Sequence, residues 1–354
     1  MKVYLVGGAV RDKLLGLKLS EKDWVVTQSS EAEMLALGYY KIGSDFPVFL
    51  HPVTKEEYAL ARTERKTSKG YKGFSVDTNK SVTLEEDLKR RDLTINAIAE
   101  DVDGNLIDPF GGQKDIKKRV LRHVSNAFLE DPLRILRIAR FKTKLNIFDF
   151  KIYKPTLNLL KKMVSHGDID YLVPERVWLE TIKSLSYKKP SVFFETLKEC
   201  NAFDKVFPEL QIINNFSVID NISCGDLNIK WAVLLIKLYE KTVLKLCNRL
   251  KCPKATTEMA LLSSRWYEFV KSFKKQKAID IYDFYKNCDA LRREKRFLTL
   301  LEVYKVSNIN TKPIKDCLKL LQGIDTKLLN KKNIKDEITK ARLQIINKYI
   351  VENK

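Results

Sequence analysis

Short apolar runs separated by turn-forming residues dominate the first third of the chain. MKVYLVGGAV, the first ten residues, predicts a buried strand that ends in a Gly-Gly turn, and RDKLLG then begins a helix. The runs DWVV and EEYALAR predict two further strands. This part of the chain therefore predicts a mixed β-sheet with helices beside it.

From about residue 150 onward, apolar residues recur at intervals of three and four, with lysines on the opposite faces. This period predicts helices, for example in NLLKKMVSHG, SVFFETLKECNAF, KWAVLLIKLYEKTVLKLCNRL and IKDCLKLLQGI. A last pair of basic helices is expected in LLQGIDTKLLNKKNIKDEITKARLQIINKYI, joined near Asn330 to Asn333. The two patterns together predict an α+β fold class, with the sheet first and an all-α remainder.

No Pro/Ser-rich linker, internal repeat or low-complexity segment marks a domain boundary. We expect a head at residues 1–125, a helical neck at 126–205, and a helical body and tail at 206–354. A chain of 354 residues can bury two or more domain cores.

The segment EDPLRILRIAR carries the most informative chemistry of the chain. Asp131 precedes Pro132, which suits the start of a helix because its missing N–H has no partner to lose there. Arg134, Arg137 and Arg140 recur every three residues and share about a third of the helix circumference. A carboxylate and three guanidinium groups in this arrangement can bind a nucleotide. The alternative is an N-capping aspartate with three arginines on a solvated helix face.

The Gly-Gly turn in GGAVRD, which contains Gly8 and Arg11, is a candidate phosphate site. Glycines between a strand and a helix let backbone N–H groups approach a phosphate closely. The segment matches neither GxGxxG nor a Walker loop, which excludes dehydrogenases and P-loop proteins. Taken alone, a plain turn remains the alternative.

Acidic residues at the starts of two predicted strands are candidate metal ligands. Glu21 and Asp23 lie two positions apart, so alternation places both carboxylates on one face. A hard cation such as Mg²⁺ would relieve their repulsion and also bind substrate phosphates. Glu57 could point toward the same cleft, whereas Glu56 would point away. For an isolated ExD pair, two acidic residues on a turn are the commoner alternative.

Two basic segments follow the predicted strands. RTERKTSKGYKGF, residues 62–74, predicts a mobile loop near phosphates, with a solvated surface loop as an equal alternative. In RRDLTINAIA, Arg90 and Arg91 would donate to phosphates, and Asp92 would orient an arginine or cap a helix.

In chain order, GGAVRD, ExD, RTERK, RRDLTINA, DPFGG, EDPLR and PERVWLE resemble the motifs of class II tRNA nucleotidyltransferases. This family comprises the CCA-adding enzymes and bacterial poly(A) polymerases, within the polymerase-β-like superfamily. The resemblance extends from residue 1 to about 215 and is closest to the bacterial CCA-adding group. It implies a polymerase-β-like head that adds C, C and A to the tRNA 3′ end from CTP and ATP by two-metal transfer, without a nucleic-acid template.

The resemblance also implies a role for each matching residue. Glu21 and Asp23 hold the positions of the Mg²⁺ ligands, and Glu57 matches the third acidic residue of the superfamily. The residues expected to bind nucleotide are Gly8, Arg11, Arg91, Asp131, Arg134, Arg137 and Arg140.

Asp131 and Arg134 would act as a protein template for the Watson–Crick edge of CTP or ATP. Arginine is a rigid fork of donors and aspartate an acceptor, so the pair can satisfy one base edge. Guanine and uracil present the opposite pattern and would leave buried partners unpaired, at a cost of about 1–3 kcal/mol each. In PERVWLE, Glu175, Arg176 and Glu180 would brace the template helix.

One departure from the family concerns the metal site. The family has aspartate at both positions of DxD, whereas Glu21 adds a methylene that displaces its carboxylate by about 1.5 Å unless the rotamer folds back. Because Mg²⁺ demands near-ideal octahedral geometry, we expect a slower enzyme or one more tolerant of Mn²⁺.

A second departure concerns the C-terminal half. Many bacterial relatives carry an HD phosphohydrolase domain, but this chain has KWAVLLIKLYEK, with Ile236 and Lys237 at the His-Asp positions. His51, His123 and His166 all precede this segment. We therefore expect no histidine metal site there and no phosphohydrolase activity.

The net charge of +20 and the pI near 9.5 indicate an anionic partner, and tRNA is the natural one. The lysines of the C-terminal helices are candidate phosphate contacts. Basic amphipathic helices can also contact membranes, but the motifs favour RNA. Six cysteines without a CxxC pair predict reduced thiols. No signal peptide or long apolar run is evident, which predicts a cytoplasmic protein without membrane contact.

Three interpretations stay open at this point. The first is a CCA-adding enzyme, and the second is a poly(A) polymerase or an enzyme that adds only CC or only A. The third is a silenced tRNA-binding protein, suggested by Glu21 and the degenerate HD segment. The intact arginines and template residues argue against silencing. The oligomeric state is unknown from the sequence.

Overall fold

The computed structural model describes residues 1–18, 22–42, 48–66, 74–223, 225–324 and 333–353 of the chain. The chain forms two compact units. The first comprises Met1–Thr181 with Val192–Val206, and the second comprises Ile182–Ser191 with Phe207–Lys354. The expected division of the first unit into a head and a neck stays a prediction.

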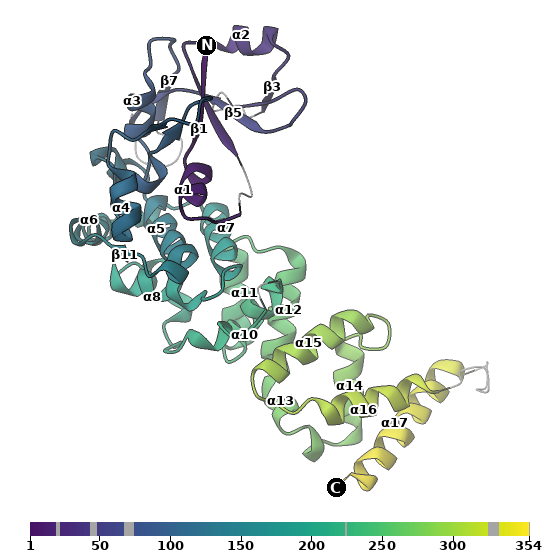
Figure 1. Ribbon diagram of the computed structural model, residues 1–354. Helices are drawn as coiled ribbons and strands as arrows, with labels where there is room; N and C mark the ends of the chain where they lie inside the picture. Colours follow the sequence, from purple (N-terminus) through teal and green to yellow (C-terminus); the bar gives the residue numbers. More distant parts are fainter. Residues whose placement is uncertain (19–21, 43–47, 67–73, 224, 325–332, 354) are drawn as a thin grey trace. The chain divides into compact units, whose positions relative to one another are not determined.

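A seven-stranded sheet forms the N-terminal part of the first unit, with the order β3-β4-β5-β2-β1-β8-β9 (Figure 1). Strand β2 pairs antiparallel with β1 and parallel with β5, so the predicted mixed sheet is confirmed. The strands are β1 (Lys2–Val6), β2 (Asp23–Thr27), β3 (Tyr40–Ile42), β4 (Val48–Leu50), β5 (Glu57–Leu60), β8 (Ala99–Glu100) and β9 (Leu106–Ile107).

Alternation along the strands gives this sheet two apolar faces. On one face Val25 of β2 belongs to a core with Leu88 of α3 (Leu84–Lys89). On the other, Val26 belongs to a core with Met34 of α2 (Glu31–Ala36). Both helices begin with a capping box, in which an N-cap hydroxyl and a glutamate exchange hydrogen bonds with the backbone. One helix therefore contributes to each face of the sheet.

The remaining elements up to residue 206 are mostly helical. They are α1 (Gly8–Leu14), α2 (Glu31–Ala36), α3 (Leu84–Lys89), α4 (Gly112–Lys118), α5 (Leu133–Lys144), α6 (Lys154–Ser165), α7 (Pro174–Leu185), α8 (Ser191–Glu199), α9 (Phe203–Val206) and the 3₁₀ turn η1 (Thr94–Asn96). Two short strands, β10 (Val120–Leu121) and β11 (Lys151–Ile152), pair in parallel.

The prediction of a loop at residues 62–74 is partly wrong. Its first part forms β6 (Thr63–Lys66), which pairs antiparallel with β7 (Phe74–Asp77). The backbone groups of these residues are satisfied by each other rather than by water. Residues 67–73 lie outside the described part of the chain.

The second unit is helical, as the apolar period predicted. Helix α10 packs against α12 and α15, and α17 packs against α14 and α16. The helices, green to yellow in Figure 1, are α10 (Leu227–Leu235), α11 (Glu240–Arg249), α12 (Lys254–Arg265), α13 (Tyr267–Lys271), α14 (Ala278–Asn287), α15 (Glu294–Val306), α16 (Lys312–Gln322) and α17 (Ile334–Glu352). The junction expected near Asn330 to Asn333 lies largely outside the described residues.

The segment KWAVLLIKLYEKTVLKLCNRL, predicted as one helical run, is two helices. Helix α10 ends at Leu235, and Tyr239 is extended before α11 begins at Glu240. The two helices differ in burial, because α10 is buried on nearly all sides whereas α11 buries only one face.

Lys230 of α10 is fully buried, and its Nζ donates to the carbonyl oxygens of Leu185 at 2.7 Å and Tyr187 at 3.3 Å. The lysine thus satisfies backbone acceptors at the end of α7. Over the described residues, no helix is both long and apolar enough to cross a membrane.

Candidate active site

The Gly-Gly turn between β1 and α1 lies against two arginines. Gly7 has a φ of +70°, which glycine adopts without strain, and α1 begins one residue later, at Gly8. A Cβ built on Gly7 would lie 2.8 Å from Nη1 of Arg91, and one built on Gly8 would lie 3.5 Å from Nη2 of Arg11. Two guanidinium groups therefore flank the turn, an arrangement that suits a phosphate.

Arg91 is oriented by a buried carboxylate. Asp87 of α3 is fully buried and accepts hydrogen bonds from Nη2 of Arg91 at 3.1 Å and from Nη2 of Arg90 at 2.7 Å. Burial opposes ionisation of Asp87, but the charges of Arg90 and Arg91 outweigh it and lower its pKa. Asp87 is therefore ionised at neutral pH and fixes both arginines.

Two carboxylates lie side by side at the starts of strands β2 and β5, near the Gly-Gly turn. Asp23 and Glu57 are exposed register partners in the parallel strands β2 and β5, so their side chains share one face. Asp23 is also the register partner of Val6, the residue before the Gly-Gly turn. Glu21 lies outside the described residues. Within the described part of the chain, no three acidic, histidine or cysteine side chains gather into a metal site.

Glu56 points away from this pair, as alternation predicts. It accepts a hydrogen bond from Nε1 of Trp24 at 3.0 Å, and Trp24 belongs to the opposite core of the sheet. Only Glu57 of the two glutamates shares the face of Asp23.

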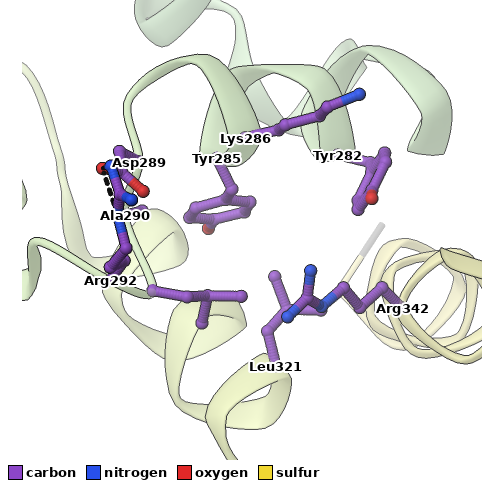
Figure 2. A pocket seen from close by; sticks show the side chains of 9 residues that line it. Tyr282, Tyr285, Lys286, Asp289, Ala290, Arg292, Leu321 and Arg342 are labelled. Atoms are coloured by element: carbon purple, nitrogen blue, oxygen red, sulfur yellow. Dashed lines mark hydrogen bonds and ion pairs between the residues drawn. The ribbon is translucent and has the colours of Figure 1, made fainter. Parts of the chain in front are cut away.

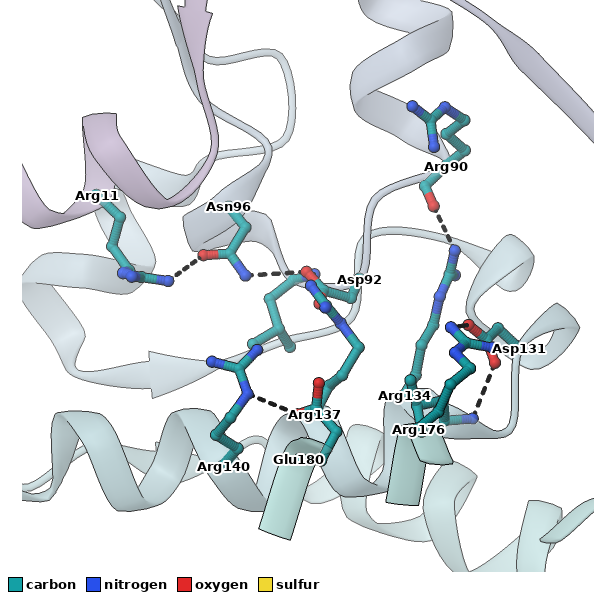
Figure 3. Close-up of polar contacts among 12 residues, drawn as sticks. Arg11, Arg90, Asp92, Asn96, Asp131, Arg134, Arg137, Arg140, Arg176 and Glu180 are labelled. Carbon is teal, nitrogen blue, oxygen red and sulfur yellow. Dashed lines mark hydrogen bonds and ion pairs between the residues drawn. The ribbon is translucent and has the colours of Figure 1, made fainter. Parts of the chain in front are cut away.

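A chain of hydrogen bonds links Arg11 to helix α5 (Figure 3). Nη1 of Arg11 donates to Oδ1 of Asn96 at 2.6 Å, and Nδ2 of Asn96 donates to Oδ1 of Asp92 at 2.9 Å. Oδ2 of Asp92 accepts from Nε of Arg137 at 2.7 Å. Burial opposes ionisation of Asp92, but the charge of Arg137 and the hydrogen bond from Asn96 hold its pKa well below its usual range. The ionised Asp92 thus sets the orientation of the Asn96 amide.

Arg11 is held from its other side as well. Oδ1 of Asp12 accepts from Nε and Nη2 of Arg11 at 2.9 and 2.7 Å, and Oδ2 of Asp12 accepts from Nζ of Lys144 at 2.7 Å. Burial and the charge of Arg11 lower the pKa of Lys144. Asp12 therefore ties α1 to the last turn of α5.

The predicted template residues both have protein partners. Oδ1 of Asp131 accepts from the N–H of Leu133 at 2.9 Å, and Oδ2 accepts from Nη2 of Arg176 at 2.9 Å. Arg134 donates to the carbonyl oxygens of Ala127 at 2.7 Å and Arg90 at 2.6 Å, as Figure 3 shows for Arg90. Asp131 therefore caps α5 and is also ion-paired across to α7.

Arg140 is buried and pairs with Glu180 of α7 at 2.5 Å. The guanidinium carbons of Arg11, Arg137 and Arg140 lie 5.2, 5.4 and 4.3 Å from the centroid of the Phe141 ring. This ring stabilises a cluster of three like charges. The solvated-face alternative is therefore wrong for Arg134 and Arg140, which are only 8% and 9% exposed.

The structure brings most of the predicted residues into one region of the first unit. Gly8, Arg11 and Arg91 meet at the turn, and Arg137 joins them through hydrogen bonds. Sequence reasoning missed Asn96, which accepts from Arg11, and Lys144, which donates to the Asp12 carboxylate that holds Arg11. Neither carries a distinctive motif of its own. Asn96 does lie inside RRDLTINAIA, but only its contacts reveal what it does.

Two family models match the chain. They are described as the poly A polymerase head domain, over residues 3–122, and the probable RNA and SrmB-binding site of polymerase A, over residues 149–213. The chain is 45% identical to a CCA-adding enzyme of Coxiella burnetii, over 99% of this chain and 96% of that protein. It is 46% identical to a multifunctional CCA protein of Pseudoalteromonas atlantica, over 85% of this chain and 84% of that protein.

Solved structures share the fold. A CCA-adding enzyme in its apo form II matches with a TM-score of 0.70 at 23% identity, over 99% of this chain and 91% of that one. The Thermotoga maritima CCA-adding enzyme complexed with tRNA_CCA matches with a TM-score of 0.65 at 22% identity, over 100% of this chain and 92% of that one. The predicted α+β fold, with its polymerase-β-like head, is confirmed.

Proposed function

The chain belongs to the family of CCA-adding enzymes, and we propose that it adds C, C and A to the 3′ end of tRNA from CTP and ATP. It works without a nucleic-acid template, so the side chains described above carry the selection of the nucleotide. We also propose an individual role for each of these side chains.

The observation that supports this proposal best is the meeting of Gly8, Arg11 and Arg91 at one turn, next to Asp23 on the adjoining strand. The triphosphate would bind against the turn, where the two guanidinium groups neutralise its charge. The 3′-hydroxyl of the tRNA would then attack the α-phosphate in line with the leaving pyrophosphate. Arg91, fixed by Asp87, would stabilise the leaving group without reorganising.

Nucleotidyl transfer of this family depends on a divalent cation, and we propose Mg²⁺. Asp23 and Glu57, with Glu21, would hold it, since adjacent carboxylate oxygens are the donors that Mg²⁺ prefers. When bound, the cation supplies activation of the 3′-hydroxyl and stabilisation of the charge on pyrophosphate.

We propose that Asp131 and Arg134 read the base, and that Arg137 and Arg140 complete the nucleotide site. Asp131 is paired with Arg176 in the structure, and Arg134 is bonded to backbone carbonyls. A base must therefore exchange these internal hydrogen bonds for its own. Cytosine and adenine can form replacement hydrogen bonds with both side chains, whereas guanine and uracil leave these side chains unpaired.

Extension of a tRNA that lacks its 3′ CCA tests the function. With divalent cation, CTP alone should add two residues, and CTP with ATP should add a third and then stop. Asp23→Asn should abolish extension. The control Asp103→Asn replaces an exposed carboxylate on the turn between β8 and β9, and extension should remain as in the unmodified chain.

Other outcomes would overturn parts of the proposal. Long A tails would identify a poly(A) polymerase, and addition of only CC or only A would identify a partial enzyme. If tRNA binds but is never extended, the chain is silenced. Recovery of extension in Glu21→Asp would then place the defect at the metal site.

We also propose that the chain acts in the cytoplasm and lacks HD phosphohydrolase activity. Ile236 is buried and Lys237 exposed in the segment between α10 and α11, where the motif would need histidine and aspartate. Hydrolysis of a 2′,3′-cyclic nucleotide by the purified chain would contradict this part of the proposal.

A pocket in the second unit is our candidate contact for the tRNA backbone. It has a volume of about 210 Å³ and is lined by Tyr282, Tyr285, Lys286, Asp289, Ala290, Leu291, Arg292, Leu321 and Arg342. Figure 2 shows Arg342 reaching from α17 toward the tyrosines of α14. Nε of Arg342 is buried and has no hydrogen-bond partner among the described residues. Asp289 pairs with Arg292, so Lys286 and Arg342 leave the pocket positively charged, as a phosphate site requires.

Arg342→Ala tests this contact, with Lys348→Ala on the exposed side of the same helix as its matched control. Loss of one phosphate contact should weaken tRNA binding and reduce the slope of log K against log salt by about 1. If both variants bind tRNA like the unmodified chain at every salt concentration, the pocket is not a tRNA site. Extension assays on the same variants keep this outcome separate from failure of catalysis.

A further inference from the structure

Helix α11 ends in a turn that places two cysteines against each other. The N–H of Cys252 donates to the carbonyl of Cys247 at 2.9 Å, and the N–H of Lys251 donates to the carbonyl of Asn248 at 3.2 Å. Lys251 has a φ of +55°. These two hydrogen bonds and the left-handed residue define a Schellman motif, in which the side chains at the positions of Cys247 and Cys252 contact each other.

The two thiols shift each other's pKa in opposite directions. Interaction with the Cys252 thiol outweighs burial and lowers the pKa of Cys247. The same interaction raises the pKa of Cys252. Both thiols are free in the structure, Cys247 buried and Cys252 partly exposed. The pair therefore combines a thiol of lowered pKa with a partner that is partly exposed to solvent.

The other described cysteines have a different environment. Cys200, Cys288 and Cys317 are buried, and burial raises the pKa of each thiol, to about 11, 12 and 11 respectively. These thiols are inert by comparison. They serve as internal references for the reactivity of the α11 pair.

We propose that Cys247 and Cys252 form a reversible disulfide, which makes the end of α11 a site of oxidative modification. A small peroxide is the oxidant. Cys252, the more exposed sulfur, passes its proton to Cys247 and attacks a peroxide oxygen, giving a sulfenic acid and hydroxide. The Cys247 sulfur then attacks the sulfenic sulfur, forming the S–S bond and releasing water. Two electrons pass from the two sulfurs to the peroxide, and a dithiol reductant reverses the step.

The disulfide would join the end of α11 to the segment that leads into α12. Oxidation therefore acts where α11 and α12 pack together, within the second unit. None of the residues proposed for catalysis takes part in this chemistry.

The test exposes the full folded chain to graded hydrogen peroxide, blocks free thiols with iodoacetamide in denaturant, and maps peptides by mass spectrometry. We expect Cys247 and Cys252 to lose alkylation together, in a linked peptide that dithiothreitol releases. Cys200, Cys288 and Cys317 should stay alkylated at the same dose. Cys252→Ser should prevent the linkage, whereas the matched control Cys288→Ser should leave it intact.

Two results would overturn the proposal. In the first, Cys247 and Cys252 remain alkylated at peroxide doses that already oxidise the three buried cysteines. In the second, the two residues are lost independently, as separate sulfinic acids that dithiothreitol does not restore. Because intact-chain circular dichroism can be measured on each variant, a misfolded variant would be recognised before it is interpreted.

Discussion

Replacing Asp92 with asparagine is the sharpest test of the hydrogen-bonded chain beside the turn. Asp92 is 6% exposed, and its Oδ2 accepts from Nε of Arg137 at 2.7 Å. In Asp92→Asn one carboxylate oxygen becomes an NH₂ group, which cannot accept. This group faces either Nε of Arg137 or, if the amide flips, the donors Asn96 Nδ2 and the Leu93 N–H. Arg137 is therefore left with a weakened partner in a partly buried position.

The burial of the Asp92–Arg137 pair sets the expected loss of folding free energy. Breaking a buried ion pair by removing one partner costs about 3–5 kcal/mol. The side chain of Arg137 is 36% exposed, so water recovers part of the loss, and we expect about 2–3 kcal/mol. For a unit of this size the midpoint of thermal unfolding should fall by about 5–10 °C.

The pH dependence gives a second, independent check. The pKa of Asp92 is lowered in the folded chain, so its stabilisation is present above the unfolded pKa of about 4 and disappears as the pH falls toward the folded value. The stability difference between Asp92→Asn and the unmodified chain should therefore be constant from about pH 5 to 8 and shrink below about pH 4.

A double-mutant cycle with Arg137→Met decides whether the pair itself carries the effect. We expect the two changes to be strongly non-additive, because each removes the same interaction. Additive effects, or a loss below about 0.5 kcal/mol for Asp92→Asn, would refute the reasoning. Because Asp92 orients Asn96 toward Arg11, the variant should also raise KM for CTP at least about tenfold.

Three further outcomes are expected. Gly7→Ala should raise KM for both nucleotides in steady-state extension assays, because its Cβ would lie 2.8 Å from Nη1 of Arg91 at a φ of +70°. An unchanged KM would show that Arg91 can move aside at no cost. Lys230→Met should destabilise the second unit by about 2 kcal/mol in denaturant titrations, because the carbonyl of Leu185 loses its buried donor. A neutral change would mean that water reaches this carbonyl. Binding of tRNA should weaken steeply between 50 and 200 mM salt, by roughly 10³-fold or more if six or more phosphates are contacted. A flat salt dependence in filter binding would contradict a mainly electrostatic interface.

Much of the fold followed from local patterns. The strand predicted at DWVV is β2, and the register with β5 puts Glu57 beside Asp23 as expected. The helical period after residue 150 gave the all-α remainder. The β6–β7 hairpin and the break between α10 and α11 were missed, because both depend on which neighbours satisfy the backbone.

The sequence by itself determined most of the strands and helices, because their periods depend on neighbours a few positions away, and its ordered motifs indicated the family and the candidate residues. Tertiary structure alone decided which charges meet. Arg11 takes Asn96, 85 positions along the chain, as its partner, and Asp131 takes Arg176, 45 positions away. Even Cys247 and Cys252, only five apart, meet because the helix ends in a left-handed residue. Hydrogen bonds and ion pairs depend on distance in space, and no period along a chain encodes that distance.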